Sequence, residues 1–285
     1  SILCETLVSI ISPGTEVAAY TGIPPLRPGN PYPRLLGYCN VARVIKVGAN
    51  VSSISVGDRV LTGSCHCSHF VILENDVFSV VPDALESRHA ACAYLYHLGY
   101  DAVIKSDLKY GNSVVVFGLG VLGLGAIATS SRAGAKVFAV SDQFFPSDIA
   151  KQLGAKEVFK RENFKELKNL LGDRLSDIVI STSNSWEDWD LALQIAGRNS
   201  YIGVIGFPGR GLSPPKNNPL DSQYFYDKQL KIEAVGHAPE ENDTRRFLKF
   251  NQKNPAKLLE FGSSSKEGRD KAKDKLADGD AGTII

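Results

Sequence analysis

The first hundred residues alternate short apolar runs with Gly, Pro and polar residues. The runs LVSIIS, ARVIKV, DRVLTG, HFVILE and FSVVP are rich in Val and Ile and have the length of typical β-strands. The opening SILCETLVSI also has the composition of a strand. The segment 22–33 (GIPPLRPGNPYP) contains too many prolines for a regular element. This pattern predicts a compact β-rich domain.

From about Lys105 onward, apolar strands alternate with helical segments. The apolar run SVVVFG is followed by a helix of small residues, predicted over 121–133, and by a second strand, KVFAVSD. Later strands are predicted in AKEVF, DIVISTS, YIGVIGF and LKIEAVG. Strands that alternate with helices at this spacing form a parallel sheet that is buried on both faces. After Gly236 the pattern becomes helical and charged, and the final GTII predicts a last strand.

Length and charge are those of an ordinary globular protein with two domains. The chain has 285 residues, 43% of them hydrophobic, with 32 Lys and Arg against 31 Asp and Glu. Nucleic acid or an anionic membrane would need a concentrated basic face. No apolar run approaches the roughly 18 residues of a membrane span. We therefore expect neither nucleic acid nor a membrane as a partner.

The cysteines and the first residues of the chain indicate the cellular compartment that we expect for the protein. The five cysteines form no disulfide framework, which favours the reducing cytoplasm. The opening segment lacks the basic region and cleavage site of a signal peptide. The chain contains no Met and begins as though inside a domain, so we expect segments of the natural protein to be missing.

The most specific motif is GLGVLG, which follows the strand SVVVF and opens the predicted helix. Gly118 permits a tight turn, Gly120 lets the backbone approach a pyrophosphate, and Gly123 lets helix and strand pack closely. Val121 and Leu122 complete the first helical turn, whose N–H groups and partial positive charge favour phosphates. This context predicts a dinucleotide site.

Asp142 ends the second strand of this unit, about 20 residues beyond the last glycine, where a carboxylate usually binds the adenosine ribose of NAD. The stretch 143–150 contains no Arg or Lys that would neutralise the 2′-phosphate of NADP. The sequence therefore favours NAD, although Ser141 keeps NADP open. Further nucleotide neighbours are predicted where later strands end, at Thr182, Ser183, Ile205 and Gly206.

Three segments together resemble a known family. ISPGTEVAAYTG, LLGYCNVARVIKVGANVSSISVGDRV and the GLGVLG unit are similar to the medium-chain dehydrogenase/reductases, which include the zinc-type alcohol dehydrogenases and their zinc-free relatives. The resemblance implies an α/β protein with a GroES-like β-rich catalytic domain (1–104) and an inserted Rossmann domain with a doubly wound parallel sheet (105–237). A C-terminal segment (238–285) would return to the catalytic domain. The resemblance also implies a substrate cleft between the domains and a homodimer.

The chain departs from the zinc enzymes at the positions of their ligands. Pro13 stands where the family has a ligand Cys, and Tyr38 stands where it has the His of Gly-His-Glu. The third ligand position falls near Ala93, beside Cys92. Pro offers no side-chain donor, and a phenol is a poor zinc ligand beside thiolate or imidazole. The four-cysteine lobe of the structural zinc is also absent, so we expect no metal.

A second group of metal-ligand types lies in Cys65-His66-Cys67-Ser68-His69. If this segment is a strand, Cys65, Cys67 and His69 share one face and His66 points the other way. The cysteine spacing lacks the two-residue gap usual for zinc. We favour side chains that pack or line a cleft here, with a metal site as the alternative.

Without zinc, hydride transfer needs other groups to polarise the substrate oxygen and deliver a proton. The resemblance places Thr15 as a relay hydroxyl and Tyr38 at the lost ligand position. His66 lies on a segment that borders the cleft in relatives, and an imidazole donates a proton near neutral pH. His97, ahead of the helix that enters the Rossmann domain, corresponds to a residue that touches the nicotinamide. The alternative for each is a structural role.

The leading hypothesis is an NAD(P)-dependent, alcohol dehydrogenase-like oxidoreductase that acts without zinc on a carbonyl, an alcohol or an activated alkene. One alternative is a catalytically silent NAD(P)-binding sensor or structural protein on the same fold, which the small number of acid–base groups favours. The other is a zinc-dependent dehydrogenase with a non-standard ligand set that uses Cys39, Cys92 or the cluster at Cys65. No motif identifies the substrate.

Overall fold

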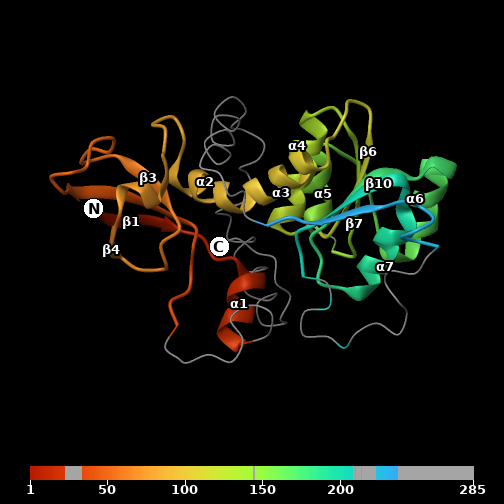
Figure 1. The fold of residues 1–285 in the computed structure, drawn as a ribbon, viewed down its shortest axis with the longest axis horizontal. Coiled ribbons are helices and arrows are strands. Elements are labelled where there is room, and N and C mark those ends of the chain that lie inside the picture. The colour runs from red at the N-terminus through yellow and green to blue at the C-terminus, as the bar shows by residue number, and fades with distance from the viewer. Residues whose placement is uncertain (23–33, 144, 208, 210–212, 214–222, 237–285) are drawn as a thin grey trace. The chain divides into compact units, whose positions relative to one another are not determined.

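A computed structural model describes residues 1–22, 34–143, 145–207, 209, 213 and 223–236 (Figure 1). The chain divides into two compact units: the first contains Ser1–His97 and the second begins at Leu98. The predicted C-terminal return over 238–285, with its helix and last strand, lies outside the described residues. None of the helices described has both the length and the apolar character that a membrane crossing requires.

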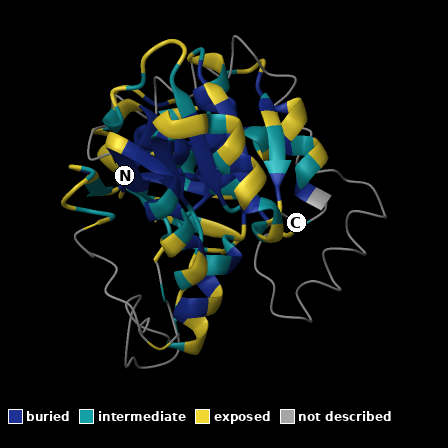
Figure 2. Ribbon diagram, turned by 90° about the vertical axis from the view of Figure 1, so that its right-hand side faces the viewer, coloured by how far each residue is buried: buried dark blue, intermediate teal, exposed yellow. Residues whose placement is uncertain are grey.

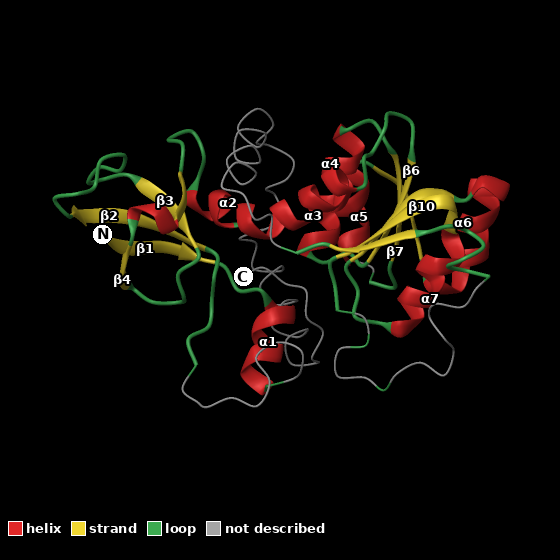
Figure 3. Ribbon diagram, in the orientation of Figure 1, coloured by secondary structure: helices red, strands yellow, loops and turns green. Residues whose placement is uncertain are grey.

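The first unit is built on an antiparallel sheet of five strands in the order β4-β1-β2-β3-β5 (Figure 3). The predicted β-rich region is therefore confirmed. Apolar side chains such as Ile2, Val44 and Val60 form its core. The strands are β1 (Ile2–Ser9), β2 (Asn40–Val47), β3 (Arg59–Thr62), β4 (His69–Ile72) and β5 (Val77–Val80).

The predicted strand over 7–12 stops early, because β1 ends at Ser9 and the helix α1 (Pro13–Thr21) follows. Pro13 occupies the first helical position, which suits its fixed φ and missing N–H. The carboxylate of Glu16 accepts from the N–H of Ser12 at 2.7 Å and caps the helix start. A short helix, α2 (Ser87–Ala91), and a 3₁₀ turn, η1 (Glu74–Asp76), complete the unit's described elements ahead of α3 (Ala93–Lys105).

The second unit contains a six-stranded, wholly parallel sheet in the order β11-β10-β9-β6-β7-β8. This is the doubly wound order, and the strand sequence reverses direction between β6 and β9. The predicted Rossmann-type sheet is therefore confirmed. Its strands are β6 (Ser113–Phe117), β7 (Lys136–Val140), β8 (Ala155–Phe159), β9 (Ser176–Ser181), β10 (Ala196–Val204) and β11 (Lys231–Ala234).

Helices cover both faces of this sheet (Figures 1 and 3). Because side chains alternate along a strand, Val115 and Phe117 of β6 face α6 and α7, and Val114 and Val116 face the opposite side. Figure 2 shows the buried central strands in dark blue. One face carries α4 (Val121–Arg132) and α5 (Phe145–Gln152), and the other carries α6 (Phe164–Leu171) and α7 (Trp186–Ile195), with 3₁₀ turns η2 (Arg161–Asn163) and η3 (Gly172–Arg174).

Candidate functional site

The turn between β6 and α4 requires glycine at two positions. Gly118 has a φ of 89°, in the left-handed region, and a Cβ there would lie 2.6 Å from Oγ1 of Thr182. The Thr182 hydroxyl donates to the carbonyl oxygen of Phe117 at 2.9 Å and so ties the ends of β6 and β9 together. A Cβ on Gly123 would lie 1.9 Å from the carbonyl oxygen of Gly118. Packing therefore explains two glycines of the motif.

Gly120 has a different environment, because a Cβ there would meet no atom of the described residues within 4 Å. It is the N-cap residue of α4, and its carbonyl accepts a helical hydrogen bond from Leu124 at 3.0 Å. The N–H groups of Val121, Leu122 and Gly123 lie in the first turn, where an α-helix offers them no carbonyl partner. Open space, these N–H groups and the positive end of the helix dipole together suit a diphosphate.

Four more predicted site residues follow β9 and β10 at the carboxyl edge of the sheet. The N–H groups of Ile205 and Gly206 donate to the carbonyl oxygen of Ser181 at 2.8 and 3.1 Å. A Cβ on Gly206 would lie 2.5 Å from the carbonyl oxygen of Ser183, so the two strand ends pack closely. Thr182, Ser183, Ile205 and Gly206 thus lie at the edge where doubly wound sheets bind ligands, and their contact with a nucleotide stays a prediction.

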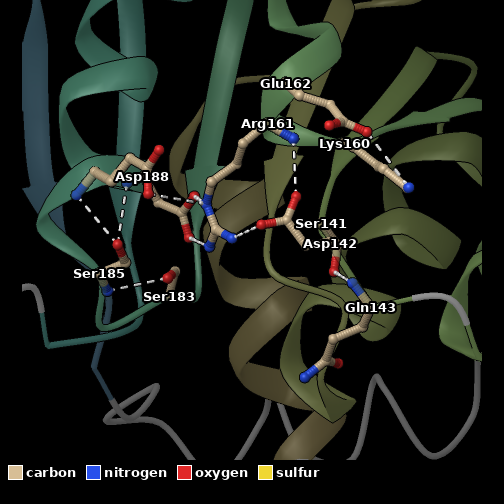
Figure 4. A network of polar contacts seen from close by, with 10 residues as sticks. Ser141, Asp142, Gln143, Lys160, Arg161, Glu162, Ser183, Ser185 and Asp188 are labelled. Atoms are coloured by element: carbon tan, nitrogen blue, oxygen red, sulfur yellow. Dashed lines mark hydrogen bonds and ion pairs between the residues drawn. The ribbon is translucent and has the colours of Figure 1, made fainter.

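Asp142 follows β7 and lies in a network of charged side chains (Figure 4). Its Oδ1 accepts from the backbone N–H of Arg161 at 2.9 Å, and its Oδ2 accepts from the Arg161 guanidinium. The same guanidinium donates to both carboxylate oxygens of Asp188, at 2.7 and 2.8 Å. Partial burial opposes ionisation of Asp142, but the hydrogen bonds and charge of Arg161, with the charge of Lys160, outweigh it and lower the pKa of Asp142.

The cations nearest Asp142 lie outside the stretch 143–150. The parallel pairing of β7 with β8 brings Lys160 and Arg161, which follow β8, to the same edge of the sheet. An open pocket of about 280 Å³ at this point is lined by Asp142, Lys160, Arg161, Glu162 and Glu187.

In the first unit, His66 joins two other side chains in a hydrogen-bonded chain. Its Nε2 lies 2.7 Å from Oε2 of Glu16, and its Nδ1 lies 2.6 Å from Oγ of Ser9. An ionised carboxylate only accepts, so Nε2 carries a proton, and in the neutral ring Nδ1 accepts from the serine hydroxyl. Glu16 is buried, and the His66 side chain is 30% exposed. Gly37 makes room for the ring, because a Cβ on it would lie 2.7 Å from the backbone nitrogen of His66.

Tyr38 lies beside this chain. Burial raises the pKa of its phenol, and hydrogen bonds with the side chains of Ser12 and Thr15 oppose that effect only in part. The Tyr38 ring meets the Tyr94 ring edge-on at 5.3 Å, which fixes its orientation. Glu16 acts electrostatically on Tyr38 and bonds to His66, so Thr15, Tyr38 and His66 come together. Glu16 is not among the site residues predicted from the sequence, although an acidic residue shortly after Ser12-Pro13 is a signal for the start of a helix.

The other histidine prediction needs a correction. His97 does not precede the helix; it lies inside α3 and is only 2% exposed. Its ring packs edge-on against Tyr94 at 4.9 Å, and its Nδ1 bonds to the carbonyl oxygen of the same residue. These contacts account for the side chain structurally, and a contact with nicotinamide stays a prediction.

The segment from Cys65 to His69 is not a strand as a whole. β4 begins only at His69, and Cys65 and Cys67 lie in the preceding loop. The condition for placing both thiols and His69 on one face, a strand through the whole segment, is therefore not met. Among the residues that the structure describes, no group of three His, Cys, Asp or Glu side chains is arranged to hold a metal ion.

The positions that match the family's zinc ligands have other contacts here. Pro13 is buried at the start of α1, and the Tyr38 phenol bonds to Ser12 and Thr15. Burial raises the pKa of the Cys92 thiol to about 12, and its Sγ donates to the carbonyl oxygen of Arg88 at 3.5 Å. Proline has no side-chain donor and a phenol is a poor zinc ligand, so Pro13 and Tyr38 do not replace the family's ligand Cys and His.

The matching family model and the similar proteins of known name are all described as dehydrogenases. A family model described as zinc-binding dehydrogenase matches residues 121–252. Sorbitol dehydrogenase of Bacillus subtilis is 22% identical over 237 residues, which are 71% of this chain and 66% of that protein. D-guloside 3-dehydrogenase of Escherichia coli is 32% identical over 180 residues, which are 60% of this chain and 50% of that protein. The matches thus span half to about two thirds of these relatives.

A solved structure extends the likeness over the whole chain. Galactitol-1-phosphate dehydrogenase from Escherichia coli superposes with a TM-score of 0.82 at 16% identity. The match covers 100% of this chain and 92% of that one. At this identity the likeness concerns the fold.

Proposed function

Because this chain belongs to the medium-chain dehydrogenase/reductase superfamily, we propose that it is an NAD-dependent, alcohol dehydrogenase-like oxidoreductase. The observation that carries the proposal is the turn of the second unit, where the N-terminus of α4 meets the open space over Gly120. This geometry suits the diphosphate of a dinucleotide. The substrate is a small carbonyl compound, an alcohol or an activated alkene.

The charges around Asp142 support NAD over NADP. The pocket there is lined by three carboxylates and two cations. Lys160 pairs with Glu162 at 3.4 Å, and Arg161 pairs with Asp142 and Asp188. A 2′-phosphate would bring more negative charge to a place where the carboxylates already outnumber the cations.

Bound NAD supplies the hydride chemistry, and the protein supplies orientation and a proton. Burial keeps the Tyr38 phenol protonated, so its hydroxyl donates a hydrogen bond to the substrate oxygen, on which negative charge develops during reduction. Thr15 orients this hydroxyl. Nε2 of His66 donates to Glu16 and its Nδ1 lies against the Ser9 hydroxyl, so the imidazole is held where it can pass a proton through that hydroxyl.

We propose that this chemistry needs no zinc. The support is the donor set of the first unit: Pro13 has no ligating side-chain atom, and the Tyr38 phenol already bonds to Ser12 and Thr15. Elemental analysis of the purified protein is expected to find zinc far below one ion per chain. A stoichiometric zinc would reject this part of the proposal and revive the dehydrogenase with a non-standard ligand set.

The test of nucleotide binding uses Gly120→Ala. The new methyl group would take the space left for the diphosphate, so NADH affinity, followed by fluorescence titration, is expected to fall about tenfold or more. The matched control is Lys136→Ala, an exposed residue at the amino end of β7, and it is expected to bind NADH like the wild type. Equal affinity in all three proteins would place the nucleotide elsewhere and overturn the proposal.

Turnover separates an enzyme from a sensor. The wild-type protein is incubated with NADH and with aldehydes, ketones, quinones and enones, and oxidation of NADH is expected with at least one class. Binding without turnover across the panel would favour the catalytically silent sensor. The superfamily resemblance further supports a homodimer, and the cysteine usage supports the reducing cytoplasm. Light scattering on the purified chain tests the dimer.

A further inference from the structure

Arg161 is fixed by a carboxylate that solvent scarcely reaches. Asp188 is 2% exposed and meets the guanidinium with both oxygens, Oδ1 to Nε at 2.7 Å and Oδ2 to Nη2 at 2.8 Å. Asp188 lies in the first turn of α7, where the helix dipole favours a negative charge, and its N–H donates to Oγ of the N-cap residue Ser185 at 3.5 Å. A two-point contact of this kind sets the plane of the guanidinium.

The fixed arginine in turn holds Asp142. Two donors of Arg161, its backbone N–H and its guanidinium, reach the two oxygens of Asp142. The Asp142 side chain remains 48% exposed, so its other lone pairs can accept from a ligand. Figure 4 shows Arg161 between the two carboxylates. Buried Asp188 thus fixes Arg161, and Arg161 in turn holds the half-exposed Asp142.

We propose that Arg161 and Asp188 are positioning residues that determine the preference for NAD. The proposal rests on the proposed function, because it concerns the ribose end of the same nucleotide site. Arg161 holds the Asp142 carboxylate ready for two ribose hydroxyls. Asp188 neutralises Arg161, so that the guanidinium offers little attraction to a 2′-phosphate. Without Asp188 the same guanidinium would be available to a phosphate, for which its planar donors are well suited.

The test compares affinities for NADH and NADPH by fluorescence titration. In Asp188→Asn the pocket gains one unit of positive charge, and NADPH affinity is expected to rise about tenfold. In Arg161→Gln the support of Asp142 is weakened, and NADH affinity is expected to fall about tenfold while NADPH gains nothing. Asp190→Asn is the matched control, because Asp190 lies on the same helix as Asp188, is exposed and bonds to Gln194. Its NADH-to-NADPH ratio is expected to stay that of the wild type.

Thermal melting of each variant separates positioning from plain stabilisation. A lower melting temperature with an unchanged NADH-to-NADPH ratio in both variants would show a structural role and overturn the inference. A wild-type protein that prefers NADPH would overturn it as well. Failure of the proposed function has a different signature, since NADH affinity would then not respond to Gly120→Ala.

Discussion

The second unit builds its nucleotide-binding turn from backbone, whereas the first unit builds its hydroxyl and imidazole network from side chains. In the turn, Gly118 and Gly123 leave no room for a Cβ, and Gly120 leaves room for a ligand. In the network, His66 meets Glu16 across 50 residues of sequence and Ser9 across 57. The turn therefore depends on the backbone conformation, and the network depends on single polar atoms of side chains. Substitutions in the turn are expected to lower stability or nucleotide affinity, and substitutions in the network are expected to lower turnover.

The largest effect is expected from Gly123→Ala. Its Cβ would lie 1.9 Å from the carbonyl oxygen of Gly118, and neither the buried helix α4 nor the strand end can move away easily. We expect a loss of about 3 kcal/mol or more in the free energy of unfolding, measured in urea, together with loss of NADH binding.

Gly120→Ala is the matched control within the same turn. Its φ is −72°, and in the part of the chain that the structure describes no atom would lie within 4 Å of its Cβ, so we expect stability within about 1 kcal/mol of the wild type. Equal stability of the two variants would contradict the view that packing fixes this turn.

Side-chain chemistry in the first unit is tested by Tyr38→Phe. The ring and its edge-on contact with Tyr94 remain, and only the hydroxyl is lost. Turnover is expected to fall about tenfold or more, with NADH affinity unchanged, because the lost interaction acts on the reacting oxygen. Tyr226→Phe removes a hydroxyl from a side chain that is 79% exposed and is expected to change neither quantity. Unchanged turnover in Tyr38→Phe would remove the phenol from the mechanism.

The same contrast explains what the sequence could predict. The strand, glycine turn and helix of the nucleotide site are contiguous over 113–132, so local pattern and conformation identify them. Arg161 reaches Asp142 only through the pairing of β7 with β8, which a search along the next eight residues cannot detect. The chain Ser9–His66–Glu16 joins three separate segments, and no local period in the sequence relates them.

Cooperation within that chain is tested by a double-mutant cycle. Glu16→Gln and His66→Gln are each expected to lower turnover several-fold, because the Glu16 carboxylate orients the His66 imidazole. The double variant is then expected to be no worse than the poorer single variant. Glu86→Gln, which breaks the exposed pair with Arg88, serves as the control and is expected to leave turnover unchanged. Losses that multiply would show that Glu16 and His66 act independently.

The smallest effect is expected at the amino edge of the second unit's sheet, away from the nucleotide turn. Asp177 accepts from the N–H and hydroxyl of Ser113 at 2.8 and 2.9 Å and so joins the starts of β6 and β9. Partial burial raises its pKa, but these hydrogen bonds and the charge of Arg174 outweigh it, so the pKa lies below the ordinary 3.8. A carboxyl group whose pKa is lower in the folded than in the unfolded state stabilises the fold at pH values above the unfolded pKa. It loses that contribution as the pH falls through the folded pKa.

Asp177→Asn is therefore expected to lower the free energy of unfolding by about 1 kcal/mol at neutral pH, with the difference from wild type shrinking below pH 3.8. NADH affinity is expected to stay unchanged, and so is the stability of the control Asp173→Asn at an exposed site. A change in NADH affinity would contradict the separation of fold from site within this unit, because it would couple the two edges of one sheet.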